Sequence, residues 1–278
     1  MITAIVSVGN FNRDFKNLQN VVNSCMGHNI QLIIVDDSDN LSIENKTELL
    51  NSAHKSLLIV ESTKRSPGGA RNTGFEHATG ETIIFWDSDD QPDIHNIISM
   101  NCELLVSKND IMIGGFNYIQ EDVYQKYVSP TTNTFRLIKN PGIWRVLFKK
   151  ELINNIKFVE CRIGEDQIYL ANVLDMKPNI GIYNKNVYNY NQAKNGITSG
   201  PLVKNDFQKT LFTLGEITLK KSINFRTAYF NILLSFLFRT NFRSLNKSMQ
   251  ALNNSRKLFG VRTFYEVIKM LFIKILYK

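Results

Sequence analysis

Short apolar runs alternate with amphipathic segments over the first 110 residues of the chain. The apolar runs do not alternate with polar residues, which is typical of buried strands, and the segments between them carry apolar residues at helical spacing. We expect strands at 3–8, 31–35, 56–60 and 82–86, and helices at 14–26, 43–53, 69–78 and 93–107. Strands and helices in this order predict an α/β fold with parallel strands.

The pattern changes after residue 110. Two neighbouring strands at 111–119 and 123–128 are expected to pair antiparallel, and further strands are expected at 142–148 and 180–190, with a helix at 164–176 between them. Together they predict a mixed, mainly parallel central sheet within a domain that covers about residues 1–200. Residues 201–278 are expected to be helical, with breaks near Ser222, Thr240 and Gly260.

Carboxylates follow two of the predicted strands. The second strand ends in Asp36-Asp37, and the fourth ends in Asp87-Ser88-Asp89-Asp90. Crowded carboxylates raise one another's pKa, and a hard divalent cation such as Mg²⁺ or Mn²⁺ relieves that repulsion. Because ligands collect at the carboxyl ends of parallel strands, we interpret these residues as a site for a metal and a diphosphate. A solvated acidic turn is the structural alternative.

Two more segments carry candidate chemistry. Ser66–Gly74 opens a helix with paired glycines and Arg71, which suits an anion at a helix N-terminus, although a plain turn explains the same residues. Glu165 and Asp166 begin a helix 75 residues after the tetrad. Either one of them is a general base, or both only complement the helix dipole.

The charge of the chain is unevenly divided. Its net charge is +8, and residues 201–278 hold 14 Lys/Arg against 3 Asp/Glu. Three cysteines lie far apart without zinc-ligand spacing, and the chain opens directly on a strand. No apolar run reaches the roughly 18–20 residues that span a bilayer. We therefore expect a cytoplasmic protein.

Taken in order, these motifs resemble glycosyltransferase family 2, whose members have the GT-A fold. The resemblance covers about residues 1–195 and is carried by the segments VDDSDN (35–40), GGARNTGFEHATGE (68–81), IIFWDSDD (83–90), GIWRVLFKKELI (142–153) and GEDQIYLANVL (164–174). Family members usually have Pro-x-Tyr-Asn after the first strand, whereas this chain has Gly9-Asn10-Phe11-Asn12.

The resemblance implies transfer of a single sugar, with inversion, from a nucleotide-diphosphate sugar to an acceptor hydroxyl. The nucleotide-sugar half would cover about residues 1–110 and the acceptor half about 111–200. The residues implied to bind the nucleotide sugar are Phe11, Asp37, Arg71, Asp87 and Asp89. The metal, Mn²⁺ or Mg²⁺, would lie at Asp87 and Asp89 with Asp90 nearby. Asp166 would be the base and Glu165 its assistant.

Trp144 is a candidate for stacking on an acceptor sugar, and a core position explains it equally well. No Gln-x-x-Arg-Trp element of processive polymerases follows the base, which favours addition of one sugar. The two alternative functions are a nucleotidyltransferase acting on a sugar phosphate and a non-catalytic nucleotide-sugar or membrane-binding protein.

The basic C-terminal region has two explanations. Thr227–Phe238 and Phe264–Lys278 mix large apolar residues with few acids, so they could lie on an anionic membrane surface. They could equally pack on the catalytic domain with a solvated basic rim. Without a nucleic-acid-binding module we expect no nucleic acid as partner. We favour a peripheral position on the cytoplasmic face of the inner membrane, beside a lipid-linked or surface-polysaccharide acceptor.

Overall fold

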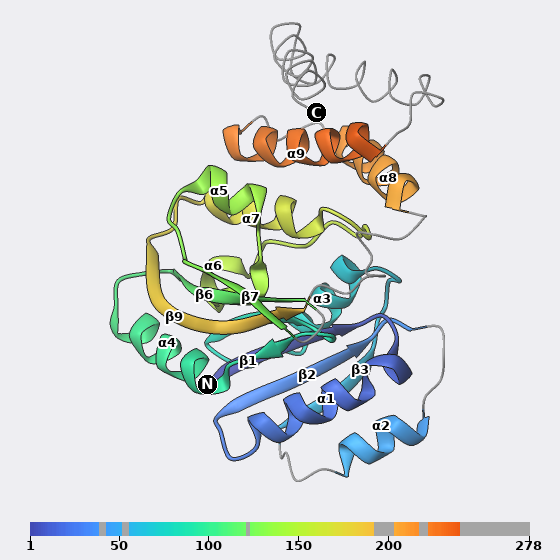
Figure 1. Ribbon diagram of the computed structural model, residues 1–278, viewed down its shortest axis with the longest axis vertical. Helices are drawn as coiled ribbons and strands as arrows, with labels where there is room; N and C mark the ends of the chain where they lie inside the picture. The colour runs from blue at the N-terminus through green and yellow to red at the C-terminus, as the bar shows by residue number, and fades with distance from the viewer. Residues whose placement is uncertain (39–42, 52–55, 121–122, 192–202, 217–221, 240–278) are drawn as a thin grey trace, which may run out of the picture.

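A mixed nine-stranded sheet forms the centre of the molecule in a computed structural model that describes residues 1–38, 43–51, 56–120, 123–191, 203–216 and 222–239 (Figure 1). The strand order is β3-β2-β1-β4-β8-β6-β9-β5, and β7 pairs with β6. The strands are β1 (Ile2–Val8), β2 (Ile30–Asp36), β3 (Leu57–Glu61), β4 (Thr82–Asp87), β5 (Gln91–Pro92), β6 (Ile111–Gln120), β7 (Val123–Val128), β8 (Val146–Lys149) and β9 (Ile180–Asn191).

The first half of the sheet is parallel. β1 lies between β2 and β4, with Ile2 opposite both Ile30 and Thr82, and β3 extends the sheet on the far side of β2. The strands β2, β3 and β4 therefore all run in the direction of β1. As a result β2 and β4 end at the same edge of the sheet, with Asp36 and Asp87. This confirms the α/β prediction.

The second half of the sheet is mixed. β8 pairs antiparallel with β4 and with β6, whereas β9 runs parallel to β6. β7 forms the expected antiparallel pair with β6. The predicted mixed sheet is thus confirmed, and each of its antiparallel pairs includes a strand that follows residue 87.

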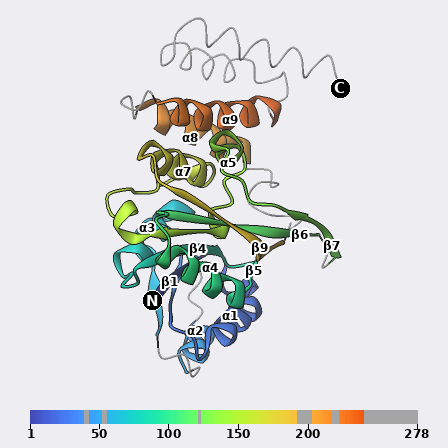
Figure 2. The same ribbon diagram turned by 90° about the vertical axis from the view of Figure 1, so that its left-hand side faces the viewer.

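Helices cover both faces of the sheet (Figure 2). They are α1 (Phe11–Cys25), α2 (Ile43–Leu50), α3 (Pro67–Glu76), α4 (Ile94–Val106), α5 (Thr134–Lys139), α6 (Lys150–Ile153), α7 (Glu165–Asp175), α8 (Val203–Glu216) and α9 (Ile223–Arg239), with a 3-10 turn at Ile143–Arg145. The core on one face includes residues of α1 and α4, and the core on the other includes residues of α3, α5, α7, α8 and α9.

Side-chain caps explain where three helices begin. The side chains of Asn10, Ser66 and Asp93 accept hydrogen bonds from the backbone at the starts of α1, α3 and α4. Such caps satisfy amide groups that have no partner within the helix. The Asn10 cap starts α1 at Phe11, three residues before the predicted beginning.

The predicted strand at 142–148 is only half correct. Gly142 has φ +42°, in the left-handed region, and the chain then makes the 3-10 turn before β8 begins at Val146. A glycine that permits this conformation leaves no trace in hydrophobic periodicity. The turn places Trp144 and Arg145 off the regular sheet. The short helix α5 was not predicted either.

The described C-terminal helices pack on the domain. In α9 the side chains of Ala228, Tyr229, Ile232, Leu233 and Phe236 are fully buried and belong to the same core as α7. These apolar side chains of the segment that we expected at a membrane are therefore covered by protein. No described helix is long and apolar enough to cross a membrane. Phe264–Lys278 lies outside the described residues, as do the expected breaks near Thr240 and Gly260.

Candidate active site

The two aspartates that end β2 have different surroundings. Asp36 is buried, its Oδ2 lies 2.6 Å from Lys46 Nζ, and its Oδ1 accepts hydrogen bonds from the amide and hydroxyl of Ser38. Asp37 is half-buried and its Oδ1 has no hydrogen-bond partner among the described residues. Burial raises the pKa of Asp37, while Ser62 and Arg65 oppose that rise. Asp37 therefore keeps a buried acceptor oxygen without a partner among the described residues, and its nucleotide role stays a prediction.

The paired glycines after Ser66 serve the protein's own packing. A Cβ on Gly68 would collide with the carbonyl oxygen of Val159, and one on Gly69 would collide with that of Lys64. Close approach is indeed the reason for glycine at both positions. The approaching group is protein backbone, which corrects the expected phosphate cradle.

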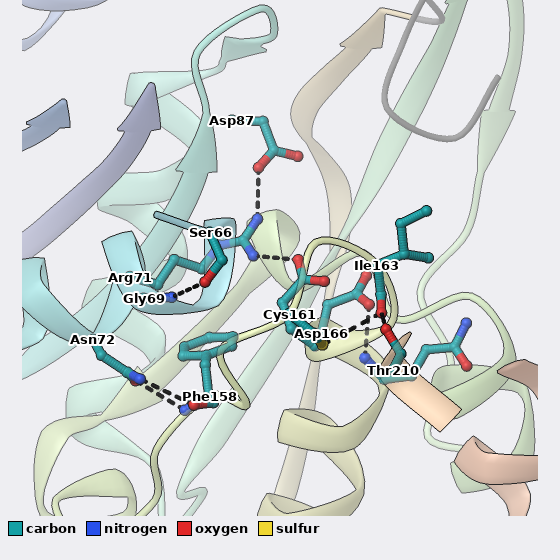
Figure 3. A network of polar contacts seen from close by, with 12 residues as sticks. Ser66, Gly69, Arg71, Asn72, Asp87, Phe158, Cys161, Ile163, Asp166 and Thr210 are labelled. Atoms are coloured by element: carbon teal, nitrogen blue, oxygen red, sulfur yellow. Dashed lines mark hydrogen bonds and ion pairs between the residues drawn. The ribbon is translucent and has the colours of Figure 1, made fainter. Parts of the chain in front are cut away.

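Arg71 joins the two halves of the site (Figure 3). Its side chain is 6% exposed, Nη2 lies 2.8 Å from Oδ1 of Asp87, and Nη1 lies 2.7 Å from Oε1 of Glu165. Burial alone lowers the pKa of Arg71, but the charges of Asp87 and Glu165 raise it above its ordinary value. We expected Arg71 to reach a phosphate; instead the structure uses it to hold two carboxylates from segments 78 residues apart.

The loop after β4 is fastened to α1. The hydroxyl of Ser88 donates to Asp14 at 2.6 Å, and Asn17 Nδ2 donates to the carbonyl oxygens of Ser88 and Asp90, both at 2.8 Å. Asp14 is buried and also pairs with Arg13 at 2.6 Å. These contacts fix the backbone from which Asp87, Asp89 and Asp90 project.

The three carboxylates of this loop do not converge. Among the described residues no group of three His, Cys, Asp or Glu could hold a metal ion. Asp90 is 1% exposed, and its Oδ1 accepts from the amide of Asn191 at 2.6 Å, which turns it into the protein. This contact gives Asp90 a structural role, and its Oδ2 is buried without a hydrogen-bond partner among the described residues. The metal role expected for Asp90 stays a prediction.

Asp87 and Asp89 are the carboxylates of this loop that solvent reaches. Asp87 is 31% exposed beside its bond to Arg71, and Asp89 is exposed. Desolvation by the loop and the charges of Asp87 and Asp14 raise the pKa of Asp89 to about 6. Two carboxylates fit a Mg²⁺-like ion, because such ions keep positions for water and substrate phosphate oxygens.

Glu165 and Asp166 open α7 with different exposures. Glu165 is buried against Arg71, whereas Asp166 is half-buried and its Oδ1 accepts from the amide of Gln167 at 2.7 Å. Burial raises the pKa of both carboxyls, and Arg71 opposes the rise. A raised pKa and an accessible oxygen suit Asp166 to accept a proton.

The segment before α7 is held by the helix that carries Arg71 (Figure 3). Asn72 Nδ2 donates to the carbonyl of Phe158 at 2.9 Å and its Oδ1 accepts from the amide of Phe158 at 2.8 Å. The ring of Phe158 stacks on Tyr169 of α7, with centroids 3.8 Å apart. Neighbouring residues of α3 thus fix both the loop before the Glu-Asp pair and one member of that pair.

The two expected aromatic contacts are core residues. Trp144 is 8% exposed and stacks on Tyr188 and Tyr190 with centroids 4.4 and 5.4 Å away. Of its two explanations, the structure favours the core. Phe11 is 1% exposed and also packs in the core, so its ring is not presented to a nucleotide.

Sequence reasoning missed the residues that support the site. They are Asp14, Asn17, Lys46 and Asn72. A buried Asp14 on the apolar face of α1 was the one readable signal, since its position falls one helical turn before Leu18.

A mixed α/β sheet with an Asp-x-Asp turn joined to a Glu-Asp helix is the arrangement of a GT-A glycosyltransferase. Residues 5–162 match the family model described as Glycosyl transferase family 2. This match covers more than half of the chain, which therefore belongs to that family.

Several curated relatives are similar over part of their length. The chain is 24% identical to glycosyltransferase GlyA of Streptococcus pneumoniae over 71% of this chain and 31% of the relative. It is 26% identical to the minor teichoic acid biosynthesis protein GgaB of Bacillus subtilis over 74% and 24%. With the UDP-Glc:alpha-D-GlcNAc-diphosphoundecaprenol beta-1,3-glucosyltransferase WfgD of Escherichia coli it shares 31% identity over 47% and 53%. The chain thus spans a third or less of the first two relatives.

Solved structures confirm the fold. TarS of Staphylococcus aureus, in complex with UDP-GlcNAc, superimposes with a TM-score of 0.70 at 16% identity, over 92% of this chain and 81% of TarS. A mannosyltransferase of Pyrobaculum calidifontis, in complex with GDP-Man and Mn²⁺, gives a TM-score of 0.58 at 17% identity over 100% and 81%. At these identities the likeness concerns the fold alone.

Proposed function

We propose that this protein transfers one sugar from a nucleotide-diphosphate sugar to an acceptor hydroxyl with inversion of the anomeric carbon. The observation that carries the proposal is the buried bridge from Asp87 through Arg71 to Glu165. It couples the carboxylates suited to a donor diphosphate to the helix that bears the base. Family membership supports the reaction class, and the two solved relatives bind UDP-GlcNAc and GDP-Man.

Each of the site residues has one task in this reaction. Asp166 takes the proton of the acceptor hydroxyl as the acceptor oxygen bonds to the anomeric carbon, while the bond from that carbon to the diphosphate breaks and its electron pair leaves with the diphosphate. Glu165 and Arg71 hold α7 and Asp87 in register. Asp37 accepts a hydrogen bond from the nucleotide. A positioned base contributes about 10²–10⁴-fold in rate.

We assign a divalent cation to Asp87 and Asp89. When bound, it supplies Lewis-acid stabilisation of the departing diphosphate. Asp14, Asn17 and Ser88 keep the carboxylates in place from behind. The Mn²⁺ complex of the mannosyltransferase supports the use of a metal without choosing between Mn²⁺ and Mg²⁺.

The acceptor we propose is a lipid-linked or surface-polysaccharide intermediate. GgaB is named for teichoic acid biosynthesis, and the name of WfgD specifies a diphosphoundecaprenol-linked sugar. We also propose that the protein acts at the cytoplasmic face of the inner membrane, with Phe264–Lys278 as the contact. Flotation with anionic liposomes, with and without residues 258–278, tests this; equal partitioning of both would contradict it.

The two alternative functions have less support. The family match joins the chain to glycosyl transferases and leaves a nucleotidyltransferase without a supporting observation. A non-catalytic binding protein would not need Asp166 held beside Arg71 and Asp87. An activity measurement decides between catalysis and binding.

The test is a panel of nucleotide sugars screened for release of nucleoside diphosphate in the presence of candidate acceptors. We expect release with at least one donor, dependence on added Mn²⁺ or Mg²⁺, and loss with EDTA. The Asp166→Asn variant should still bind the nucleotide sugar but should not release nucleoside diphosphate from it. Release by this variant at the wild-type rate would contradict the assigned base.

A further inference from the structure

One edge of β6 has a gap between two partner strands. β8 pairs with Ile111–Ile113 and β7 pairs with Phe116–Gln120, both on the edge opposite β9. Gly114 and Gly115 lie between these two pairings. Arg145, the last residue of the 3-10 turn, immediately precedes β8 and so lies beside this gap.

The guanidinium of Arg145 is buried, and no described residue forms an ion pair with it. The residue is 3% exposed, and neither Nε nor Nη1 has a hydrogen-bond partner within the described part of the chain. Its Cζ lies 4.9 Å from the ring centroid of Phe116. A Cβ on Gly142 would come within 3.2 Å of Nε, so the glycine leaves room for the side chain to fold back.

An unpaired buried cation requires an explanation. Removing a charge from water costs several kcal/mol unless a counter-charge or hydrogen bonds replace the lost hydration. Burial lowers the pKa of Arg145 to about 10, which still leaves the group charged at neutral pH, and the neighbouring phenol of Tyr127 opposes the change. The fold therefore maintains a positive charge whose protein partner is missing among the described residues.

Arg145 and the donor carboxylates act on different side chains. The charges of Asp87, Asp89 and Asp90 act on Tyr188 and Tyr190, which stack on Trp144. None of these charges is among those that shift the pKa of Arg145. The guanidinium packs instead on Phe116, whose ring meets Trp144 edge-on with centroids 4.8 Å apart. Both residues belong to the half of the chain that we expect to receive the acceptor.

Tyr127 is an exposed residue that acts on this site. Its side chain belongs to β7, lies over Gly115, and is 39% exposed. Any side chain at position 115 would displace the phenol, because a Cβ on Gly115 would collide with it. The phenol is close enough to Arg145 for its charge to act on the guanidinium.

We propose that Arg145, with Phe116 and Tyr127, binds a phosphate group carried by the acceptor. Guanidinium offers paired donors that match phosphate oxygens, and two of its N–H-bearing nitrogens are free in this structure. The proposal rests on the proposed glycosyltransferase function for the identity of the ligand as an acceptor. Binding of phosphate itself does not depend on that function.

The first experiment measures binding without turnover. Thermal unfolding of the wild type, Arg145→Met and the exposed control Arg136→Met is followed with and without inorganic phosphate. We expect phosphate to raise the Tm of the wild type and of Arg136→Met but not of Arg145→Met. An equal rise in all three proteins would overturn the proposal.

Stability in buffer separates a binding role from a structural one. Because Arg145 has no charged partner, Arg145→Met should unfold at the same temperature as the wild type or a higher one. A clear fall in its Tm would show that the guanidinium supports the fold and would count against a ligand site. Arg145→Lys keeps the charge but loses the paired donors, and should keep only part of the phosphate-induced rise.

The second experiment identifies the source of the phosphate. With a competent donor, transfer is measured to a phosphorylated acceptor sugar and to its unphosphorylated counterpart. Arg145→Met should raise KM about tenfold for the phosphorylated acceptor and leave the other acceptor and the donor KM unchanged. A rise in donor KM would instead place the donor diphosphate at Arg145 and overturn the proposal. Absence of transfer by the wild type would contradict the proposed function alone.

Discussion

Two buried arginines, Arg71 and Arg145, occupy opposite electrostatic situations. Arg71 lies between Asp87 and Glu165 at 2.8 and 2.7 Å, and those charges raise its pKa. Arg145 is also buried but has no carboxylate beside it among the described residues, and its pKa falls to about 10. The paired arginine organises the donor side, and the unpaired one is the residue expected to meet substrate. Removing each should therefore have different consequences.

The largest effect at the site that Arg71 organises should come from the base. Asp166→Asn keeps the shape of the side chain but cannot accept the acceptor proton, so we expect kcat to fall about 10²–10⁴-fold. Nucleotide affinity, measured by calorimetry in the presence of Mg²⁺, should stay within a factor of about two because Asp37, Asp87 and Asp89 are untouched. The matched control Glu160→Gln, at an exposed carboxylate of the preceding loop, should retain full activity. A loss of affinity equal to the loss of rate would contradict the separation of roles.

A smaller effect is expected behind the metal carboxylates. Asp14→Asn weakens the hydrogen bond to Ser88 and the pair with Arg13, which loosens the loop without removing a proposed ligand. Changes to groups that orient metal ligands lower metal affinity about 10–100-fold. Titration of Mn²⁺ into the protein with bound nucleoside diphosphate, followed by electron paramagnetic resonance, measures this directly. Unchanged Mn²⁺ affinity would show that α1 does not support the site.

A change at Glu165 measures how much its ion pair with Arg71 contributes to stability. Glu165→Gln removes one of the two charges beside Arg71 while Asp87 remains, so we expect a loss of about 1–3 kcal/mol in the free energy of unfolding. The exposed control Glu76→Gln, whose nearest cation is Lys157 at 3.9 Å, should be neutral. Urea denaturation of both variants gives the comparison. Equal stabilities would mean that the buried pair contributes nothing.

The pH dependence of transfer should report the same pair of carboxyls. Burial raises the pKa values of Glu165 and Asp166, and a protonated Asp166 cannot act as a base. As the pH rises through the raised pKa, the base becomes charged and kcat/KM should increase to a plateau. We expect the acid limb of the profile to lie above the ordinary range of an aspartate, near 3.9. A rate independent of pH down to 4 would refute this.

The sequence predicted the features that repeat or cluster. Buried strands carry enough apolar residues to be recognised, and the carboxylates of Asp37, Asp87 and Asp166 stand at the ends or starts of elements where their chemistry is readable. The partners of buried charges are set by tertiary contacts, so the joining of Arg71 to Glu165 and the burial of Asp90 could not be read from spacing. For the same reason the sequence did not point to Arg145, because only the structure shows that its guanidinium is buried without a partner among the described residues.

Thermal unfolding of Arg71→Met and Arg145→Met, side by side, tests the central comparison most directly. Methionine has a similar length and no charge in both places. Arg71→Met leaves Asp87 and Glu165 without their cation, so it should lose about 3–5 kcal/mol of stability, whereas Arg145→Met should lose none and even gain. Equal destabilisation of the two variants would contradict the account, because Arg145 would then be as firmly partnered as Arg71.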